Sequence, residues 1–176
     1  IISYNLCYTY LHYFHKFNMI IMYMKTQKNK TGKNKVYTEI PTIHEINGYQ
    51  ILLLNIPSSN IAHIQSVIKI GLLNETKNNS GISHLLEHVL VNSWEQCGKH
   101  SCLKLLTEKG IQCNAFTGSS YTQFYTTIVK ENLNEMLEYI TTISTCANIK
   151  QKYINDEISP LFNELKGYDN NPINSL

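Results

Sequence analysis

The chain has 176 residues, of which 43% are hydrophobic and 16% are charged. This length suits one folded domain, and the composition is typical of a globular protein, which excludes an intrinsically disordered chain. The net charge of +2 is too small to favour a nucleic-acid partner. All 15 basic residues are lysines, so the chain has no arginine to grip a carboxylate through two parallel hydrogen bonds.

Residues 1–35 are predicted to form an N-terminal extension and a polar linker ahead of the domain. Histidines and a lysine interrupt the apolar residues 1–24, which therefore lack both the long apolar run of a membrane span and the pattern of a signal peptide. Residues 25–35 are lysine-rich and carry no apolar periodicity, as is typical of a solvated linker. The catalytic domain is expected to span residues 36–176 and to be incomplete at its C-terminus. Because the chain begins with Ile rather than Met, we expect a fragment of a longer protein.

The first part of the predicted domain is rich in strands. Two β-prone runs, 36–46 and 49–55, flank Asn47 and Gly48, and this Asn-Gly pair predicts a tight hairpin because both residues tolerate a positive φ. Residues 61–70 alternate between apolar and polar side chains, which predicts a strand with one buried face.

Helices and a second hairpin follow. Ser80 is expected to cap a helix over 81–91, and a second helix over 101–109 should stop at Gly110. Strands at 111–116 and 121–129 flank a turn.

The last two predicted elements are helices. The amphipathic pattern of residues 132–145 predicts a helix packed on the sheet. A final helix over 150–168 is expected to kink, or to restart with Ser159 as its cap, because Pro160 lacks a backbone donor. The prediction is an α+β fold, with an antiparallel-rich mixed sheet and helices packed on one face.

A short motif in the helix over 81–91 carries the chemistry. Residues 84–88 read His-Leu-Leu-Glu-His. Positions i and i+4 of a helix project from one face, so His84 and His88 could bind one zinc ion. Glu87 leans to the same side and would accept a proton from a water that the zinc acidifies. This order of residues is the inverzincin signature, although a short motif also arises by chance on a solvated helix.

The stretch 81–90 resembles the active-site helix of the insulinase/pitrilysin family of zinc metallopeptidases. The resemblance continues, in the same order along the chain, through 46–51, 70–71, 110–117 and 167–172. It implies the catalytic half of an insulinase-like unit, one bound Zn²⁺, and an endopeptidase that hydrolyses extended peptides or unfolded protein segments.

The resemblance also supplies further site residues. The family places a third metal ligand about 76 residues beyond the second histidine, which matches Glu164 (164 − 88 = 76). A family glutamate seven residues earlier matches Glu157, which is expected to orient a ligand imidazole. Asn114 and Ala115 match the strand on which an extended substrate would add through main-chain hydrogen bonds. For Asn114 an ordinary turn or edge residue is an equally open interpretation.

Cysteines and the remaining histidines are assigned no part in the site. Five irregularly spaced cysteines favour reduced thiols and an intracellular location. Cys97, His100 and Cys102 could bind a metal, but this run lacks a paired second run, so loop thiols are the simpler interpretation. The other histidines are expected to be structural or exposed: His12, His15, His44 and His63.

Two functions remain open from the sequence. The first is a zinc endopeptidase whose cleft is completed by a second homologous half or a partner subunit. The second is a non-catalytic structural or substrate-presenting subunit that retains the fold. Presence of the full set His84, Glu87, His88 and Glu164 favours catalysis. Neither a membrane nor a nucleic acid is expected as a partner.

Overall fold

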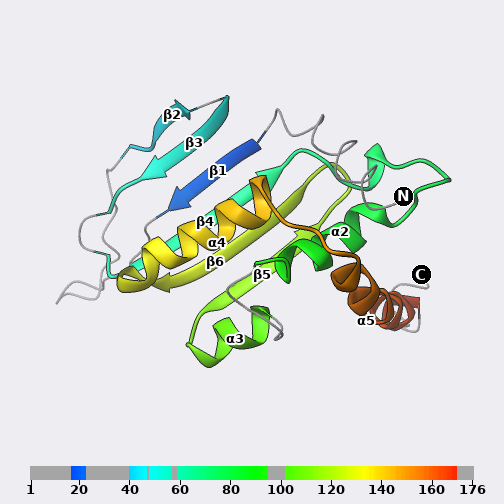
Figure 1. Ribbon diagram of the computed structural model, residues 1–176. Helices are drawn as coiled ribbons and strands as arrows, with labels where there is room; N and C mark the ends of the chain where they lie inside the picture. The colour runs from blue at the N-terminus through cyan, green and yellow to red at the C-terminus, as the bar shows by residue number, and fades with distance from the viewer. Residues whose placement is uncertain (1–16, 23–39, 47, 57–58, 95–101, 170–176) are drawn as a thin grey trace.

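The computed structural model describes residues 17–22, 40–46, 48–56, 59–94 and 102–169 (Figure 1). Within these residues one mixed sheet contains six strands: β1 Phe17–Met22, β2 Thr42–Ile46, β3 Tyr49–Leu54, β4 Ile61–Ile68, β5 Gln112–Thr117 and β6 Thr122–Val129. The strand order is β2-β3-β1-β4-β6-β5, and every neighbouring pair is antiparallel except β1 and β3. The predicted antiparallel-rich mixed sheet is confirmed.

Strand β1 corrects the prediction for the N-terminal segment. The sequence analysis placed these residues in an extension ahead of the domain, whereas β1 lies inside the sheet, parallel to β3 and antiparallel to β4. The run FNMIIM is short and nearly all apolar, a pattern that is consistent with a strand inside a sheet. The lysine-rich segment that follows β1 made it look separate from the domain.

In the part of the chain that the structure describes, four helices accompany the sheet: α2 Ile82–Val91, α3 Cys102–Glu108, α4 Leu133–Thr145 and α5 Gln151–Asp169. Helix α4 packs on β4 and β6, while α2 packs on β5, β6 and α4, so these helices cover one face (Figure 1). Short 3₁₀ turns lie at Leu72–Asn74 (η1) and Lys130–Asn132 (η3). Helices on one face of the sheet were predicted, and this is confirmed.

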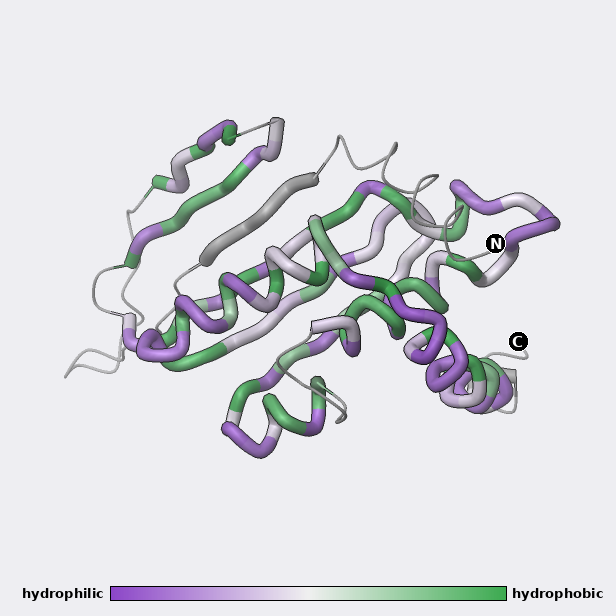
Figure 2. Tube along the Cα trace, viewed as in Figure 1, coloured by the Kyte–Doolittle hydropathy of each residue, from purple (hydrophilic) through white to green (hydrophobic). Residues whose placement is uncertain are grey.

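The core lies between the sheet and this helical layer. Alternate residues of β4 and β6, including Ile64 and Phe124, are buried, whereas their neighbours in sequence are more exposed. From α4, Met136, Tyr139 and Ile140 are buried against them. Figure 2 shows the matching pattern, with the hydrophobic side of α4 turned toward the sheet. This alternation has the period of two that a half-buried strand requires.

Helix α5 differs from the other helices because it packs on α2 and extends away from the sheet (Figure 1). The helix is continuous through Pro160, so of the two predicted alternatives the restart at Ser159 is wrong, while the kink stays a prediction. A proline removes a single backbone donor, and the rest of this 19-residue helix keeps its bonding pattern. Glu157 and Glu164 are therefore carried by one continuous helix.

Helix α2 begins with a cap that the sequence analysis did not predict. Gly81, with a φ of 85°, occupies the cap position and offers no side chain. Glu75, instead of the expected Ser80, accepts hydrogen bonds from the backbone N–H groups of Gly81 (2.7 Å) and Ser83 (2.8 Å). A carboxylate is a strong acceptor for the unpaired N–H groups of a helix start.

The cysteines also depart from the prediction. Cys102 is disulfide-bonded, so the expectation that every thiol is reduced is wrong, and the intracellular location that rested on it loses its support. Cys97 and His100 lie outside the described residues. Cys113 and Cys146 are free, and burial raises the pKa of the Cys113 thiol. Separately, no helix within the described ranges has both the length and the apolar character that crossing a membrane requires.

Candidate metal centre

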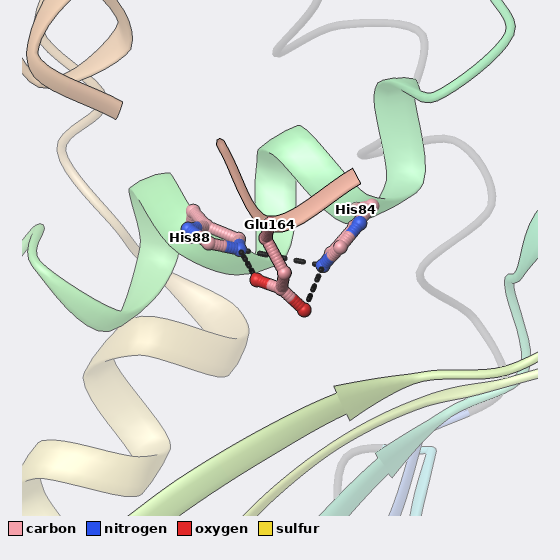
Figure 3. Close-up of side chains that lie close together, drawn as sticks. All are labelled: His84, His88 and Glu164. Atoms are coloured by element: carbon pink, nitrogen blue, oxygen red, sulfur yellow. Dashed lines mark hydrogen bonds and ion pairs between the residues drawn. The ribbon is translucent and has the colours of Figure 1, made fainter. Parts of the chain in front are cut away.

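Three side chains from two helices converge beside α2. His84 and His88 project from one face of α2, and Glu164 reaches them from α5 (Figure 3). The Nε2 atoms of His84 and His88 lie 3.3 Å apart. The Glu164 carboxylate places Oε1 3.7 Å from Nε2 of His84 and Oε2 3.3 Å from Nε2 of His88. Among the described residues, this is the group whose donor atoms gather closely enough to hold a metal ion.

The separations fit the size of a tetrahedral zinc site. Zinc binds histidine nitrogens and carboxylate oxygens at about 2.0–2.2 Å, which puts two ligand atoms of a tetrahedron about 3.3–3.6 Å apart. The Nε2 atoms of His84 and His88 lie 3.3 Å apart, and Oε2 of Glu164 lies 3.3 Å from Nε2 of His88. With one ligand atom taken from each residue, the three atoms lie within 4.8 Å of one another. Two imidazoles and one carboxylate also match the donor set of catalytic zinc sites, which keep a fourth position open. The residues present therefore fit a zinc ion.

Glu157 fixes the orientation of one imidazole. Its Oε2 lies 3.2 Å from Nδ1 of His88, and an ionised carboxylate can only accept, so Nδ1 is the donor. A neutral ring protonated at Nδ1 presents the Nε2 lone pair, which faces His84 and Glu164. The other oxygen of Glu157 accepts a hydrogen bond from Nδ2 of Asn92 at 2.8 Å. Asn92, which follows α2 directly, thus holds Glu157 in place.

Glu87 lies on the same helix but belongs to a different contact. It is 9% exposed, and its Oε2 accepts a hydrogen bond of 2.5 Å from the hydroxyl of Thr117, at the end of β5. The Thr117 hydroxyl is also 3.4 Å from that of Thr122. The carboxylate of Glu87 is thereby bonded to the β5–β6 hairpin. Although Glu87 is close to both histidines in sequence, it does not belong to the group of converging donor atoms.

The C-terminal end of α2 is anchored in the core. The hydroxyl of Tyr139, on α4, donates a hydrogen bond to the Val91 carbonyl at 3.1 Å. The Tyr139 ring packs against Trp94, with the ring centroids 5.2 Å apart. Burial raises the pKa of the Tyr139 hydroxyl far above its ordinary value, so it stays a donor. With Glu75 at the other end, α2 is fixed at both termini.

Asn114 and Ala115 lie on strand β5, which ends the strand order of the described sheet. Asn114 is exposed, and its side-chain oxygen accepts a hydrogen bond from the N–H of Ala115 at 2.9 Å. Helix α2 packs on this strand, so β5 lies beside the helix that carries the histidine pair.

A hollow of about 570 Å³ adjoins the centre. His84 and Thr117 line it on one side, and Leu72, Leu161 and Leu165 give it apolar walls. Its volume is within the range of ligand pockets.

Several supporting residues escaped the sequence analysis. Glu75, Asn92 and Thr117 each contact a site residue or its helix, yet none belongs to a recognisable spacing. His44 bonds Thr42, and His63 bonds Thr127, so neither joins the metal group, while His12 and His15 lie outside the described residues.

Known proteins are similar to this chain in sequence and fold. A family model described as Insulinase (Peptidase family M16) matches residues 50–176. An uncharacterized zinc protease, YmxG, of Bacillus subtilis is 28% identical over 126 residues, which cover 72% of this chain and 31% of that protein. Human insulin-degrading enzyme is 25% identical over 119 residues, 67% of this chain and 12% of the enzyme. A protease structure from Helicobacter pylori superposes with a TM-score of 0.68 at 23% identity, covering 78% of this chain and 34% of that one.

The fold and the family model together place the chain in a family of peptidases. The chain belongs to the insulinase family, peptidase family M16. It spans about a third of the length of the Bacillus and Helicobacter proteins that it matches.

Proposed function

We propose that this chain carries the catalytic segment of a zinc-dependent endopeptidase that hydrolyses extended peptides or unfolded protein segments. The observation that carries the proposal is the convergence of His84, His88 and Glu164, with donor separations that suit one zinc ion. The zinc proteases among its relatives support the same activity.

In this proposal His84, His88 and Glu164 hold the metal, and Glu157 orients His88. Zinc bound there would lower the pKa of a coordinated water and polarise the carbonyl of the scissile amide. Glu87 would accept the proton of the attacking water and pass it to the leaving amine. The hydrogen bond from Thr117 keeps the Glu87 carboxylate in one orientation while it does so.

The substrate would bind as an added strand. Strand β5 is last in the order of the described strands, so its outer edge can offer main-chain groups to an extended peptide. Asn114 and Ala115 are the proposed contacts on this edge, and the neighbouring hollow would accommodate a substrate side chain. An unfolded segment supplies the free backbone that such pairing requires.

We further infer that more protein covers the outer face of α5. Ile158 and Phe162 are exposed there, whereas Leu161 packs inward. The matched part of this chain covers 31% of the Bacillus protein and 34% of the Helicobacter protein, and exposed apolar side chains on one helix favour a protein contact. A second homologous half or a partner subunit is the proposed occupant, and it would complete the cleft.

Substitution Glu87→Gln tests the assigned mechanism. The amide cannot act as a base, so hydrolysis of an unfolded protein should fall by about 10²–10⁴-fold, while zinc binding stays unchanged. Glu108→Gln removes an exposed carboxylate from α3 and should have no effect. Equal hydrolysis by the wild type and Glu87→Gln would show that the base is misassigned.

The same assay addresses the second candidate, a non-catalytic subunit. A wild-type preparation that binds one zinc per chain, yet hydrolyses no unfolded protein when the longer protein is assembled, would favour a structural or substrate-presenting role.

A further inference from the structure

We propose that Glu75 is a positioning residue that sets the place of His84 in the metal centre. The inference rests on the proposed zinc site and deepens it. Glu75 lies outside α2, directly after η1, and its distance in sequence from the histidines does not predict a contact with them. Its carboxylate spans the start of α2, with one oxygen bound to the N–H of Gly81 and the other to the N–H of Ser83.

The first turn of α2 depends on this contact. The leading N–H groups of a helix have no partner within it, and Gly81 supplies no side-chain cap. Two backbone hydrogen bonds also form at this turn. The N–H of Ile82 donates to the carbonyl of Asn79, and the N–H of Leu85 donates to the carbonyl of Gly81. Helix ends open more readily than helix centres. Glu75 therefore opposes fraying of the turn that carries His84.

The two histidines differ in what holds them. His88 lies one turn further into α2, and Glu157 bonds its ring. His84 lies in the first turn, directly after Ser83, whose N–H Glu75 holds. Glu75 and His84 also line the same hollow. Loss of the carboxylate should displace the His84 ring while the His88 ring stays held by Glu157.

The loop that carries Glu75 is itself fixed to the β5–β6 turn. The N–H groups of Leu72 and Leu73 donate to the carbonyls of Gly118 (3.1 Å) and Ser119 (2.8 Å). Gly71 approaches this turn so closely that an added Cβ would lie 2.3 Å from the Gly118 carbonyl oxygen. The same turn follows Thr117, which bonds Glu87. The loop that carries Glu75 thus connects the start of α2 with strand β5, whose Thr117 bonds Glu87, the proposed base.

Charge favours the arrangement as well. The N-terminus of a helix carries a partial positive charge, which an adjacent carboxylate offsets. In the proposed site, His84 would hold a metal cation close to this helix N-terminus. Without a nearby negative charge, the partial positive charge of the N-terminus would repel that cation. The Glu75 carboxylate therefore supplies both the two acceptors and the charge that the metal site requires.

The test compares zinc affinity in the full chain and in Glu75→Gln. Glutamine has the same shape, but its amide offers one acceptor oxygen and turns N–H groups toward the other donor. Competition with a chromophoric chelator should show zinc binding weakened by about 10–100-fold, the usual effect of a residue that supports a metal ligand. Substituted Co²⁺ should give an altered visible spectrum, because its coordination geometry changes.

Ser144→Ala is the matched control. It removes a buried hydrogen bond to Ser66, between α4 and β4, so it should lower the melting temperature and leave zinc affinity unchanged. Equal zinc affinity in Glu75→Gln and the wild type would overturn the inference, as would equal losses in both variants. A wild-type chain that binds no zinc would overturn the proposed function itself.

Hydrogen exchange on the wild type tests the contact without any variant. The N–H groups of Gly81 and Ser83 should exchange slowly and become slower when zinc binds, because coupling between two contacts is reciprocal. Fast exchange of both groups in the zinc-loaded chain contradicts the proposal even if Glu75→Gln does not fold.

Discussion

The two ring nitrogens of His88 have separate partners. Nδ1 faces Glu157 at 3.2 Å, and Nε2 faces His84 and Glu164, each at 3.3 Å. A histidine that ligates a metal usually donates its other N–H to such a carboxylate, which sets the tautomer and the ring orientation. Glu157 is fixed in turn by Asn92. The lone pair of Nε2 is thereby aimed by contacts that exist without a metal.

His63 lies on the opposite face of β4 from the core residues, and its lowered pKa predicts a pH effect on stability. Partial burial lowers its pKa below the ordinary 6.5, against a smaller opposing effect of Gln65. The folded protein therefore favours the neutral ring, and stability that is present above pH 6.5 is lost as the pH falls through the lowered pKa. Between pH 7.5 and 5, the melting temperature of the wild type should fall more than that of His63→Gln. Parallel curves for the two proteins would contradict this.

The residues of the site were predictable to different degrees. His84, Glu87 and His88 follow from the helical repeat, which is local in sequence. Glu164 required a resemblance, because a separation of 76 residues carries no geometric meaning by itself. Glu75 and Thr117 were not predictable, since their contacts depend on how separate elements pack. Such tertiary hydrogen bonds leave no periodic pattern.

Helix α5 carries one of the three residues of the metal group, yet it has little buried apolar surface for its length. Of its described side chains, Leu161 is the buried apolar one, 8% exposed, while Phe162 beside it is 59% exposed. Among the described elements, α2 is the one with which α5 makes its main contact. Its placement of Glu157 and Glu164 thus depends on a small apolar contact together with the polar contacts of the site.

Leu161→Ala should detach this helix. Truncation of a buried leucine costs about 2–5 kcal/mol, which is comparable to what a single-helix contact supplies. Amide exchange along α5 should accelerate, and zinc affinity should fall because Glu164 loses its position. Phe162→Ala, at the exposed neighbouring site, should change neither quantity. Equal exchange rates in the two variants would show that α5 is held by something else.

The predicted elements agree with the structure where local patterns are strong. The strands at 61–68 and 122–129 and the helix at 133–145 lie within two residues of their predicted bounds. The restart at Ser159 was wrongly predicted because a proline removes only one backbone donor, and α5 continues through it. Ser80 misled the prediction because a cap can come from a distant carboxylate.

At the scale of the whole molecule, β1 joins the two parts of the sheet. It pairs with β3 on one side and with β4 on the other, so the β2–β3 hairpin reaches β4 through β1. The sequence did not reveal this role, because pairing between distant strands depends on tertiary register and β1 is separated from β2 by a polar segment.

Deletion of residues 1–24 should therefore damage the fold. Without β1, the facing edges of β3 and β4 lose every ladder hydrogen bond that β1 provides, and the β2–β3 hairpin is left marginal by itself. Limited proteolysis should cut the shortened chain between residues 40 and 56 much faster than the intact chain. An equal digestion pattern would mean that residues 1–24 are dispensable for the sheet.

The central claim is that His84, His88 and Glu164 bind one zinc ion. Titration of the metal-free chain should give one zinc per chain, and Glu164→Gln should weaken binding by more than about 100-fold, beyond the loss expected for a supporting residue. Asp156→Asn, which removes an exposed charge from the same helix, should bind as the wild type does. Zinc binding by Glu164→Gln that is as tight as that of the wild type would contradict the account.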